Sequence, residues 1–518
     1  MLSVLSIAGE MESEEQIPVS FWLVSSKRGL LEEADRIASL PIRSRVYLSR
    51  EELKATYGPP DEAVEAVHAF AQKHGLEWIG GDAGGTLVHL MVSKSKVKHL
   101  FEVDLPQSDP EGSQPFPAPQ NAICLPREDF SGRQLSMIRG IFGLDRGRQT
   151  SPSLVSHSHA SSLSSFQFPY PTPDEFKGDG QCVGILQFGG LFEDRDLNAV
   201  IRNNTAAANV SIVIPIRFKP TPYAAFYSET SLDVQIVARV VPNAKQVLYL
   251  LPNSQQGWIA GIERVLLDTD NAPSVLSISA GWPEMGGSPG VSYWSPAAFA
   301  ALEDMFARAT LIGMTVCCAS GDSGPAVNNG PHVFYPASSP YVLACGGTQN
   351  NGTEVVWSDR LGASGGGISD VFPIPSWQRC VQANVLASDG LHRPAGALQG
   401  RLVPDVAAPA QAFIQGYGAV TGTSAAAPLW AGLIALANQQ LQAKSINKTV
   451  GNLTAILYDQ SSGLQGACDD ITTGNNAVPR GNLAYYSAGL GWDACTGWGS
   501  PTGQPFIEKL LENATEQP

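Results

Sequence analysis

Short apolar runs alternate with segments of helical periodicity over residues 168–518. The runs are rich in β-branched residues, and helical patterns at 228–241, 258–268 and 296–313 lie between them. Apolar strands that alternate with helices predict a parallel sheet covered by helices on both faces. Functional groups of such sheets gather at the carboxyl ends of the strands, where loops lead into helices. The apolar runs are "VSIVIPIRF", "QVLYLL", "SVLSIS", "MTVCCAS" and "YVLACGG".

The N-terminal part of the chain has a different pattern. Residues 1–16 form a short extension, and residues 17–104 predict a compact α+β unit. Residues 105–167 connect the two parts and include a polar low-complexity run over 147–166 that proteases should reach. The expected elements of the small unit are strands at 18–24 and 86–92 and helices at 30–40 and 60–75.

Charge and hydropathy limit the partners and the location of the protein. The net charge is −15 and 16% of the residues are charged, which disfavours nucleic acid or anionic membranes as partners and suits work in acid. No run approaches the roughly 18 apolar residues that span a bilayer. Sequons occur at six positions although no signal peptide is evident, so we expect secretion or an acidic vacuole or lysosome. The sequons begin at Asn203, Asn209, Asn351, Asn447, Asn452 and Asn513.

The stretch "GTSAAAP", residues 422–428, predicts a nucleophilic serine. Gly422 permits a tight turn, and a helix that begins at Ser424 directs free N–H groups and its positive dipole end at a developing oxyanion. An ordinary N-cap before an alanine-rich helix is the alternative interpretation. No histidine lies in a segment like the His-Gly-Thr-His of subtilisins, so the base must be sought elsewhere.

Two carboxyls upstream are candidates for that base. Glu229 and Asp233 are four residues apart and share one face of a helix, which apolar Val237 continues and turns inward. Two carboxyls so close on a buried face cannot both ionise easily, and the pKa of one should rise. A solvated acidic first turn is the alternative.

A third carboxyl follows an apolar strand in "CCASGDSG". Asp322 either supports this Gly-rich turn or is held protonated and donates a hydrogen bond to an oxyanion.

The C-terminal run from Cys468 to Pro501 offers hard oxygen ligands. Asp470 and Asp493 supply carboxylates, and Gly489 and Gly491 expose carbonyls, a mixture that calcium accepts. A Gly/Asn turn cluster is the alternative, because the spacing matches no EF-hand loop. The eight cysteines show no CxxC spacing, so we expect no zinc site and one or two disulfides, with Cys468–Cys495 the best pair.

Six motifs in order resemble those of the sedolisins, the serine-carboxyl peptidases. The resemblance covers residues 168–505, and residues 17–104, with "VYLSREELKATYG", are similar to the family's propeptide. It implies an α/β fold, a subtilisin-like parallel sheet flanked by helices, preceded by a small α+β propeptide domain. Ala280 departs from the tryptophan usual in the family. The motifs are "YSETSLDVQ", "SISAGWPE", "ASGDSG", "RLVPDVAAPA", "GTSAAAP" and "GLGWDACTGWGSP".

The resemblance also implies roles for single residues. Ser424 matches the nucleophile, Glu229 the general base, Asp233 the carboxyl that orients it, and Asp322 the donor to the oxyanion. One structural calcium ion is implied, with the ligands Asp470, Ile471 through its backbone carbonyl, Gly489, Gly491 and Asp493. The implied substrates are peptides or denatured proteins.

Acid dependence follows from carboxyl catalysis. A carboxylate base titrates near pH 4.3 and Asp322 donates only while protonated, so activity should rise below about pH 6 and disappear near neutrality. The propeptide is expected to act as chaperone and inhibitor, held partly by charge pairs that weaken as carboxylates protonate. Acid should then trigger self-cleavage between residues 147 and 168.

Three other functions are alternatives. A neutral subtilisin-like protease needs His332 or His392 as its base. A catalytically inactive secreted binding protein would leave four suitable residues without use. A glycosidase using Glu229 and Asp233 gives no role to "GTSAAAP" and places both carboxyls on one side of the substrate. The sequence does not distinguish an endopeptidase from a tripeptidyl peptidase.

Overall fold

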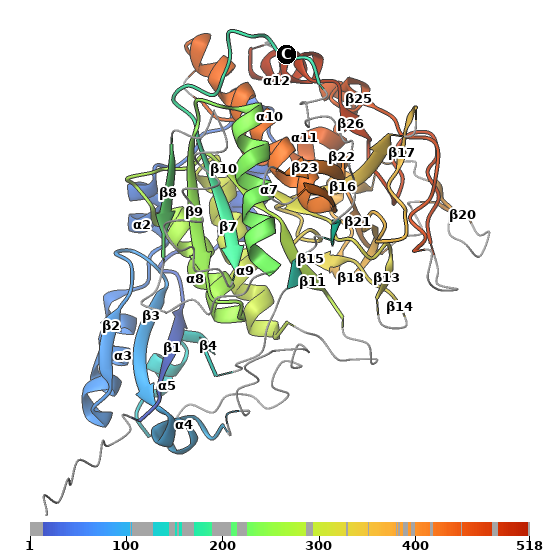
Figure 1. The fold of residues 1–518 in the computed structure, drawn as a ribbon. Coiled ribbons are helices and arrows are strands. Elements are labelled where there is room, and N and C mark those ends of the chain that lie inside the picture. Colours follow the sequence, from blue (N-terminus) through green and yellow to red (C-terminus); the bar gives the residue numbers. More distant parts are fainter. Residues whose placement is uncertain are drawn as a thin grey trace, which may run out of the picture.

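The computed structural model consists of a small N-terminal domain packed against a large α/β domain (Figure 1). It describes residues 14–103, 105, 128–144, 151–152, 155–157, 170–188, 209–214, 225–285, 294–327, 330–350, 352–379, 381, 384–386, 392–394, 399–414, 418–446, 448–478 and 485–515.

An eight-stranded sheet forms the centre of the large domain. Its strand order is β17-β16-β12-β10-β7-β9-β8, and β22 also pairs with β16. Every pairing is parallel except that of β16 with β17, which confirms the parallel sheet predicted from the apolar runs. The strands are β7 (Cys182–Phe188), β8 (Val210–Val213), β9 (Lys245–Leu251), β10 (Val275–Ile278), β12 (Thr315–Ala319), β16 (Leu343–Asn350), β17 (Glu354–Val356) and β22 (Val406–Pro409).

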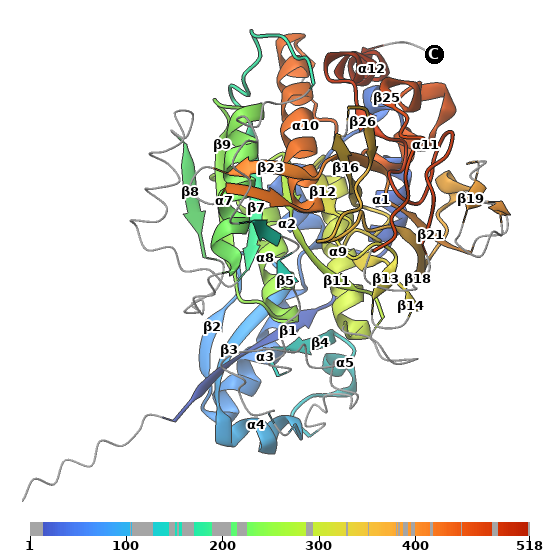
Figure 2. The same cartoon turned by 45° about the vertical axis from the view of Figure 1, so that its right-hand side comes forward.

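Helices cover both faces of this sheet. α7 (Ala225–Val240), α10 (Ala426–Ala443) and α12 (Gln504–Thr515) pack together over one core, and α8 (Gln255–Leu267) and α9 (Pro296–Leu311) over a second. The short apolar strands are buried completely because each face meets a helix layer. Figure 2 shows α10 and α9 on different sides of the strands.

Smaller elements connect these layers and line the edges of the domain. They are β11 (Ala280–Pro283), β13 (Ala326–Val327), β14 (Gly330–Pro331), β15 (Phe334–Tyr335), β18 (Gly367–Pro373), η2 (Ser376–Gln378), β19 (Asn384–Leu386), β20 (His392–Pro394), β21 (Gly400–Val403), β23 (Gln411–Ile414), β24 (Gly418–Thr421), η4 (Thr423–Ala425), α11 (Thr454–Tyr458), η5 (Gln460–Ser462), η6 (Gln465–Ala467), β25 (Cys468–Asp469) and β26 (Ser500–Pro501).

The N-terminal domain is a four-stranded antiparallel sheet in the order β2-β3-β1-β4, with helices against it. Both strands and both helices predicted for 17–104 are present, and the domain also takes α5 and β4 from beyond residue 104. Its elements are β1 (Gln16–Leu23), α1 (Leu30–Ala38), η1 (Ile42–Ser44), α2 (Arg50–Tyr57), α3 (Asp61–His74), β2 (Glu77–Gly80), β3 (Leu87–Ser93), α4 (Lys94–Phe101), α5 (Gly132–Leu135) and β4 (Ile138–Phe142).

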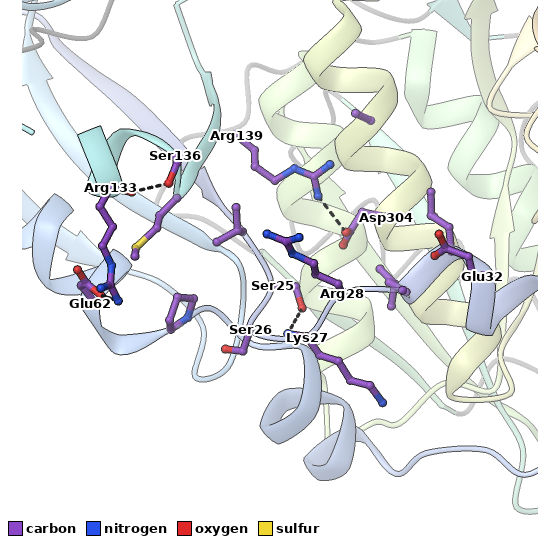
Figure 3. A pocket seen from close by; sticks show the side chains of 17 residues that line it. Ser25, Ser26, Lys27, Arg28, Glu32, Glu62, Arg133, Ser136, Arg139 and Asp304 are labelled. Atoms are coloured by element: carbon purple, nitrogen blue, oxygen red, sulfur yellow. Dashed lines mark hydrogen bonds and ion pairs between the residues drawn. The ribbon is translucent and has the colours of Figure 1, made fainter. Parts of the chain in front are cut away.

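Hydrogen bonds join the two domains. Glu263 on α8 is 5% exposed and accepts from the Thr86 backbone N–H (2.6 Å), the Thr86 hydroxyl (2.9 Å) and the Leu87 N–H (3.3 Å). Arg139 lies 3.6 Å from Asp304 on α9. This pair borders a cavity of about 660 Å³ between the domains (Figure 3). The small domain is therefore docked through buried polar contacts as well as apolar ones.

The expected disulfide is absent. Cys468 and Cys495 are both free and buried, and their sulfurs lie against the backbone carbonyls of Leu464 and Tyr486. The prediction was wrong because both thiols sit in an apolar core, where cysteine packs as a small hydrophobic residue. Among the helices that the structure describes, none combines the length and apolar character needed to cross a bilayer.

Candidate active site

Four segments from distant parts of the sequence converge at one end of the sheet. The helix α7 packs against η4, which carries Ser424, and Ser279, the residue after β10, is bonded to both. The loop after β12 brings Asp322 to Thr423, the neighbour of Ser424. The site lies beyond the carboxyl ends of β10 and β12, the place predicted for functional groups of a parallel sheet.

Ser424 is buried at the start of α10. Its hydroxyl donates to the Ser279 carbonyl oxygen at 3.1 Å, and residues 423–425 form a 3₁₀ turn before the helix begins. The backbone N–H groups of this first turn point away from the helix, because a helix start has no intrahelical acceptors for them. The predicted placement of the serine at a helix N-terminus is thus observed, one 3₁₀ turn earlier than the α-helix itself.

Glu229 lies on the buried face of α7 and is 1% exposed. Burial and the neighbouring Asp233 raise its pKa well above the ordinary value, and the facing Ser424 hydroxyl offsets part of that rise. Neither carboxyl oxygen has a hydrogen-bond partner at bonding distance, since the Ser424 hydroxyl is turned to Ser279. The helix predicted to place Glu229 and Asp233 on one inward face is observed.

Asp233 has both carboxyl oxygens occupied. Oδ1 accepts from the Ser279 hydroxyl at 2.7 Å, and Oδ2 accepts from the Gln187 side-chain amide at 2.5 Å. Burial raises the pKa of Asp233 to about 8, and these two donors oppose the rise. Its partners fix the orientation of the carboxyl beside Glu229.

Two of these partners were missed from sequence. Gln187 is 2% exposed near the end of β7, and Ser279 is 1% exposed directly after β10. The available signal for Gln187 was a single amide inside the apolar run "CVGILQF". A buried polar side chain needs a partner, and the carboxyl of Asp233 is that partner.

Asp322 is held by Thr423. Its Oδ1 accepts from the Thr423 N–H at 2.8 Å and from the Thr423 hydroxyl at 2.7 Å, while Oδ2 is enclosed and has no partner. Burial raises the pKa of Asp322 to about 7 against the effect of the Thr423 donors. Gly321 before it has φ +106°, and a Cβ there would lie 1.8 Å from the Phe334 ring, so the turn requires glycine.

The segment between the two domains passes along this site. β5 (Ser151–Pro152) pairs antiparallel with β11, Ser151 opposite Gly281 and Pro152 opposite Ala280. β6 (Val155–His157) pairs antiparallel with β24, Val155 opposite Thr421 and His157 opposite Ala419. β11 begins one residue after Ser279, and β24 ends three residues before Ser424. Residues 153 and 154, which separate β5 from β6, lie outside the described residues.

The histidines considered as alternative bases do not join the described site. His332 pairs through Nδ1 with Asp370 Oδ2 at 3.0 Å, and none of its described contacts reaches Ser424. The backbone of His392 lies in β20, which pairs only with β19, and its side chain is outside the described part. The structure therefore does not favour a histidine base.

The predicted calcium ligands meet in one loop cluster. Asp470 Oδ2 accepts from the Gly491 N–H at 2.8 Å, and Asp493 Oδ2 accepts from the Gly489 N–H at 3.2 Å. The side chain of Ile471, the residue after Asp470, is buried. The described residues hold no cluster of three metal-binding side chains, so a cation here would depend on backbone carbonyls as well as on the two carboxylates.

Family models match both parts of the chain. The subtilase family model matches residues 223–499, and that of the pro-kumamolisin activation domain matches residues 5–146. The second match includes α5 and β4, in agreement with their place in the N-terminal sheet.

Known proteins resemble the whole chain. Kumamolisin of Bacillus sp. strain MN-32 is 32% identical, with 98% of this chain and 94% of that protein covered. Tripeptidyl-peptidase sed5 of Aspergillus fumigatus is 26% identical over 91% of this chain and 89% of its own length. The solved structure of Pseudomonas sedolisin, a serine-carboxyl proteinase, matches with a TM-score of 0.52 and 28% identity over 65% of this chain and 94% of that chain.

Proposed function

The chain belongs to the sedolisin family of serine-carboxyl peptidases, and we propose that Ser424 is its nucleophile, Glu229 its general base, Asp233 the carboxyl that orients the base, and Asp322 the donor to the oxyanion. The protein is a serine-type hydrolase with a propeptide of the kumamolisin type. The proposal concerns which of its residues do the chemistry, and how.

One observation carries this assignment. Within the described part of the chain, three buried carboxyl oxygens have no hydrogen-bond partner, and they are the two of Glu229 and Oδ2 of Asp322. Leaving such an oxygen unsatisfied costs roughly 1–3 kcal/mol each, so folds rarely contain them without a use. Glu229 faces the Ser424 hydroxyl, and Asp322 is bonded to Thr423, the residue before Ser424, so a substrate carbonyl and its leaving amine bound there would supply the missing partners.

The steps follow from these positions. The Ser424 hydroxyl gives its proton to Glu229, and Ser424 Oγ bonds to the carbonyl carbon of the substrate. The resulting oxyanion accepts a hydrogen bond from protonated Asp322 Oδ2. Glu229 returns the proton to the leaving nitrogen as the C–N bond breaks. Water then attacks the acyl-enzyme and gives a proton to Glu229, which passes it to Ser424 Oγ as the acyl C–O bond breaks and the acid product is released.

The titration of these groups sets the working pH. Asp322 carries the donating proton below about pH 7 and loses it above, where its negative charge repels the oxyanion. Burial raises the pKa of both Glu229 and Asp233, and Glu229 acts as base only in the state in which it is unprotonated and Asp233 holds a proton. The loss of the Asp322 proton sets the alkaline limit, so activity should fall as the pH rises through about 7.

Maturation is proposed to occur between β5 and β6. The segment pairs with β11 as far as Pro152 and with β24 from Val155, and these two strands lie next to Ser279 and Ser424 in the sequence. This position falls within the 147–168 window. Sequencing the N-terminus of protein matured at pH 4 tests it, and a first residue outside 153–155 contradicts it.

A structural calcium ion is proposed at the loop cluster around Asp470 and Asp493. Asp493 is 3% exposed, and its Oδ1 accepts from the Cys495 and Thr496 N–H groups at 2.9 Å. Since none of the ion pairs in the described part of the chain includes Asp493, a cation would offset the remaining buried charge. Gly489 and Gly491 have open space where a Cβ would stand, which leaves room beside the loop. The ion would stabilise the C-terminal loops and takes no part in the reaction.

The functional test uses the purified full-length chain. We expect it to digest denatured casein at pH 4 and not at pH 7.5, with a serine-reactive phosphonate labelling Ser424 at pH 4. An acidic location, extracellular or in a vacuole or lysosome, is proposed from this pH range. Activity that is maximal at pH 7–8 contradicts the assignment.

A further inference from the structure

A second contact between the two domains lies at the opposite end of the sheet from Ser424. Residues 43–50 of the small domain, from η1 to the first residue of α2, cross the large domain where β10 and β12 begin, at Pro273 and Gly313. Ser424 lies beyond the carboxyl ends of the same two strands. Figure 2 shows α1 and α2, on either side of this segment, among the elements of the large domain and apart from β1 to β4.

Arg45 is the centre of this contact. Its side chain is fully buried, and Nη1 donates to the carbonyl oxygens of Val450 at 2.9 Å and Asn452 at 2.6 Å in the large domain. Nε and Nη2 donate to carbonyl oxygens of the small domain, those of Leu40 and Ala38, both at 2.8 Å. A guanidinium fits such a cage because it presents its donors in a fixed plane and stays charged.

Tyr47 occupies a slot between two glycines of the large domain. A Cβ at Gly313 would lie 2.6 Å from the Tyr47 ring, and a Cβ at Gly451 would lie 2.2 Å from the Tyr47 hydroxyl oxygen. Both glycines have positive φ, +72° and +67°, and the Tyr47 hydroxyl donates to the Val450 carbonyl oxygen at 3.1 Å. Because any side chain at these two positions would fill the slot, glycine is required for the tyrosine to enter.

The loop that forms this surface is held in place by the large domain itself. The Thr315 hydroxyl donates to the Gly451 carbonyl oxygen at 2.6 Å, and the Val450 N–H donates to Asn438 Oδ1 at 2.8 Å. The Thr449 hydroxyl donates to the Gly313 carbonyl oxygen at 2.5 Å. None of these hydrogen bonds involves the small domain, so the surface should keep its shape after the small domain has been removed.

Arg50 adds a third anchor to the same segment. Its Nε donates to the Asp268 carbonyl oxygen at 3.1 Å, and its Nη2 donates to that of Pro273 at 2.7 Å. In the other direction, Lys448 Nζ donates to the Arg43 carbonyl oxygen. The three anchoring side chains belong to one short stretch, "RVYLSR", residues 45–50, so the surface fits a segment with the pattern Arg-x-Tyr-x-x-Arg.

We propose that this surface is an exosite of the mature protein, which binds residues 43–50 of the cleaved small domain without occupying the active site. The ligand is recognised by two guanidinium groups on backbone carbonyls and by a tyrosine ring between two glycines. This inference goes beyond the proposed function and rests on it only because maturation separates the two domains.

The test uses the full chain, processed at pH 4 until the small domain is digested and then blocked at Ser424 with the phosphonate. A fluorescent peptide copying residues 40–58 should bind the blocked protein saturably at pH 5, measured by anisotropy. Arg45→Met and Tyr47→Ala in the peptide should each weaken binding at least about tenfold, because the buried donors or the ring are lost. Val46→Ala, at a side chain that is 74% exposed, is the matched control and should bind within about twofold.

Three outcomes overturn the exosite and leave the serine peptidase intact: no binding, equal binding of all the peptides, or binding only to the unblocked protein. A chain that does not process itself contradicts the proposed function instead. The exosite is then tested in the full chain nicked by trypsin in the run over 147–166. The small domain should dissociate at least about tenfold faster from the Arg45→Met variant than from the Val46→Ala variant, and equal rates overturn the inference.

Discussion

The site around Ser424 and the interface around Glu263 both contain buried carboxyls, but the hydrogen bonding of these carboxyls differs. Glu263 is 5% exposed and receives three hydrogen bonds from the small domain, whereas Glu229 is 1% exposed and receives none. Burial raises the pKa of both. A raised pKa alone therefore does not identify a catalytic carboxyl. A carboxyl oxygen without a hydrogen-bond partner beside a nucleophile does.

The largest expected effect is at the nucleophile. Ser424→Ala should lower kcat by roughly 10⁴- to 10⁶-fold and leave the chain unprocessed at pH 4, because no other group attacks the carbonyl. Gel analysis and casein digestion measure both. Ser277→Ala, which removes a buried hydroxyl without a partner, is the matched control and should mature normally. Maturation of purified Ser424→Ala would contradict self-processing.

Matched amide substitutions test the two buried glutamates directly. Glu229→Gln should lower kcat by roughly 10²- to 10⁴-fold, because an amide accepts no proton from Ser424. Glu263→Gln should leave kcat of the mature enzyme unchanged and weaken inhibition by added propeptide about tenfold, since one acceptor of the interface is lost. Similar losses of kcat in both variants would remove the distinction between the two regions.

Asp322→Asn tests whether the enclosed Oδ2 of Asp322 donates a hydrogen bond to the oxyanion. An amide at this position keeps an acceptor for Thr423 and donates a hydrogen bond at every pH, so the fall in kcat/KM near pH 7 should move to higher pH. The activity at pH 4 should stay within about tenfold, whereas Asp322→Ala should lose roughly 10²- to 10³-fold at all pH values. Complete pH–rate profiles of both variants decide this, and an unchanged alkaline limb in Asp322→Asn assigns that limb to another group.

The smallest effect on catalysis is expected at the calcium loop. Removing calcium with EDTA should lower the Tm of the full chain. If the ion is present at 100 times its Kd, its removal lowers the free energy of unfolding by about 2.7 kcal/mol. Asp470→Asn should lower calcium affinity in a calorimetric titration while kcat at saturating calcium is unchanged. An unaltered Tm and no heat of binding would count against the site.

The sequence predicted the sheet, its covering helices and the face shared by Glu229 and Asp233, because these follow from periodicity within one segment. It missed Ser279 and Gln187 as partners of Asp233, because they lie 46 residues away on either side and meet it only across the sheet. The sequence also did not predict the pairing of β5 with β11 and of β6 with β24. A polar low-complexity run has no periodicity that would indicate which strand it pairs with.

The buried contact of Glu263 with the small domain has a consequence for product inhibition. Docked, its pKa is about 7, raised by burial and by Asp82 against the pull of Thr86 and Arg308; freed of the domain, an exposed carboxyl titrates near its ordinary value. The docked form thus takes up a proton between these values, and docking tightens as the pH falls. This pH dependence is opposite to the one expected from charge pairs, which weaken as carboxylates protonate and would release the propeptide in acid. A cleaved propeptide should therefore have a longer residence time at pH 5 than at pH 7.5, and its own digestion should end the lag before full activity.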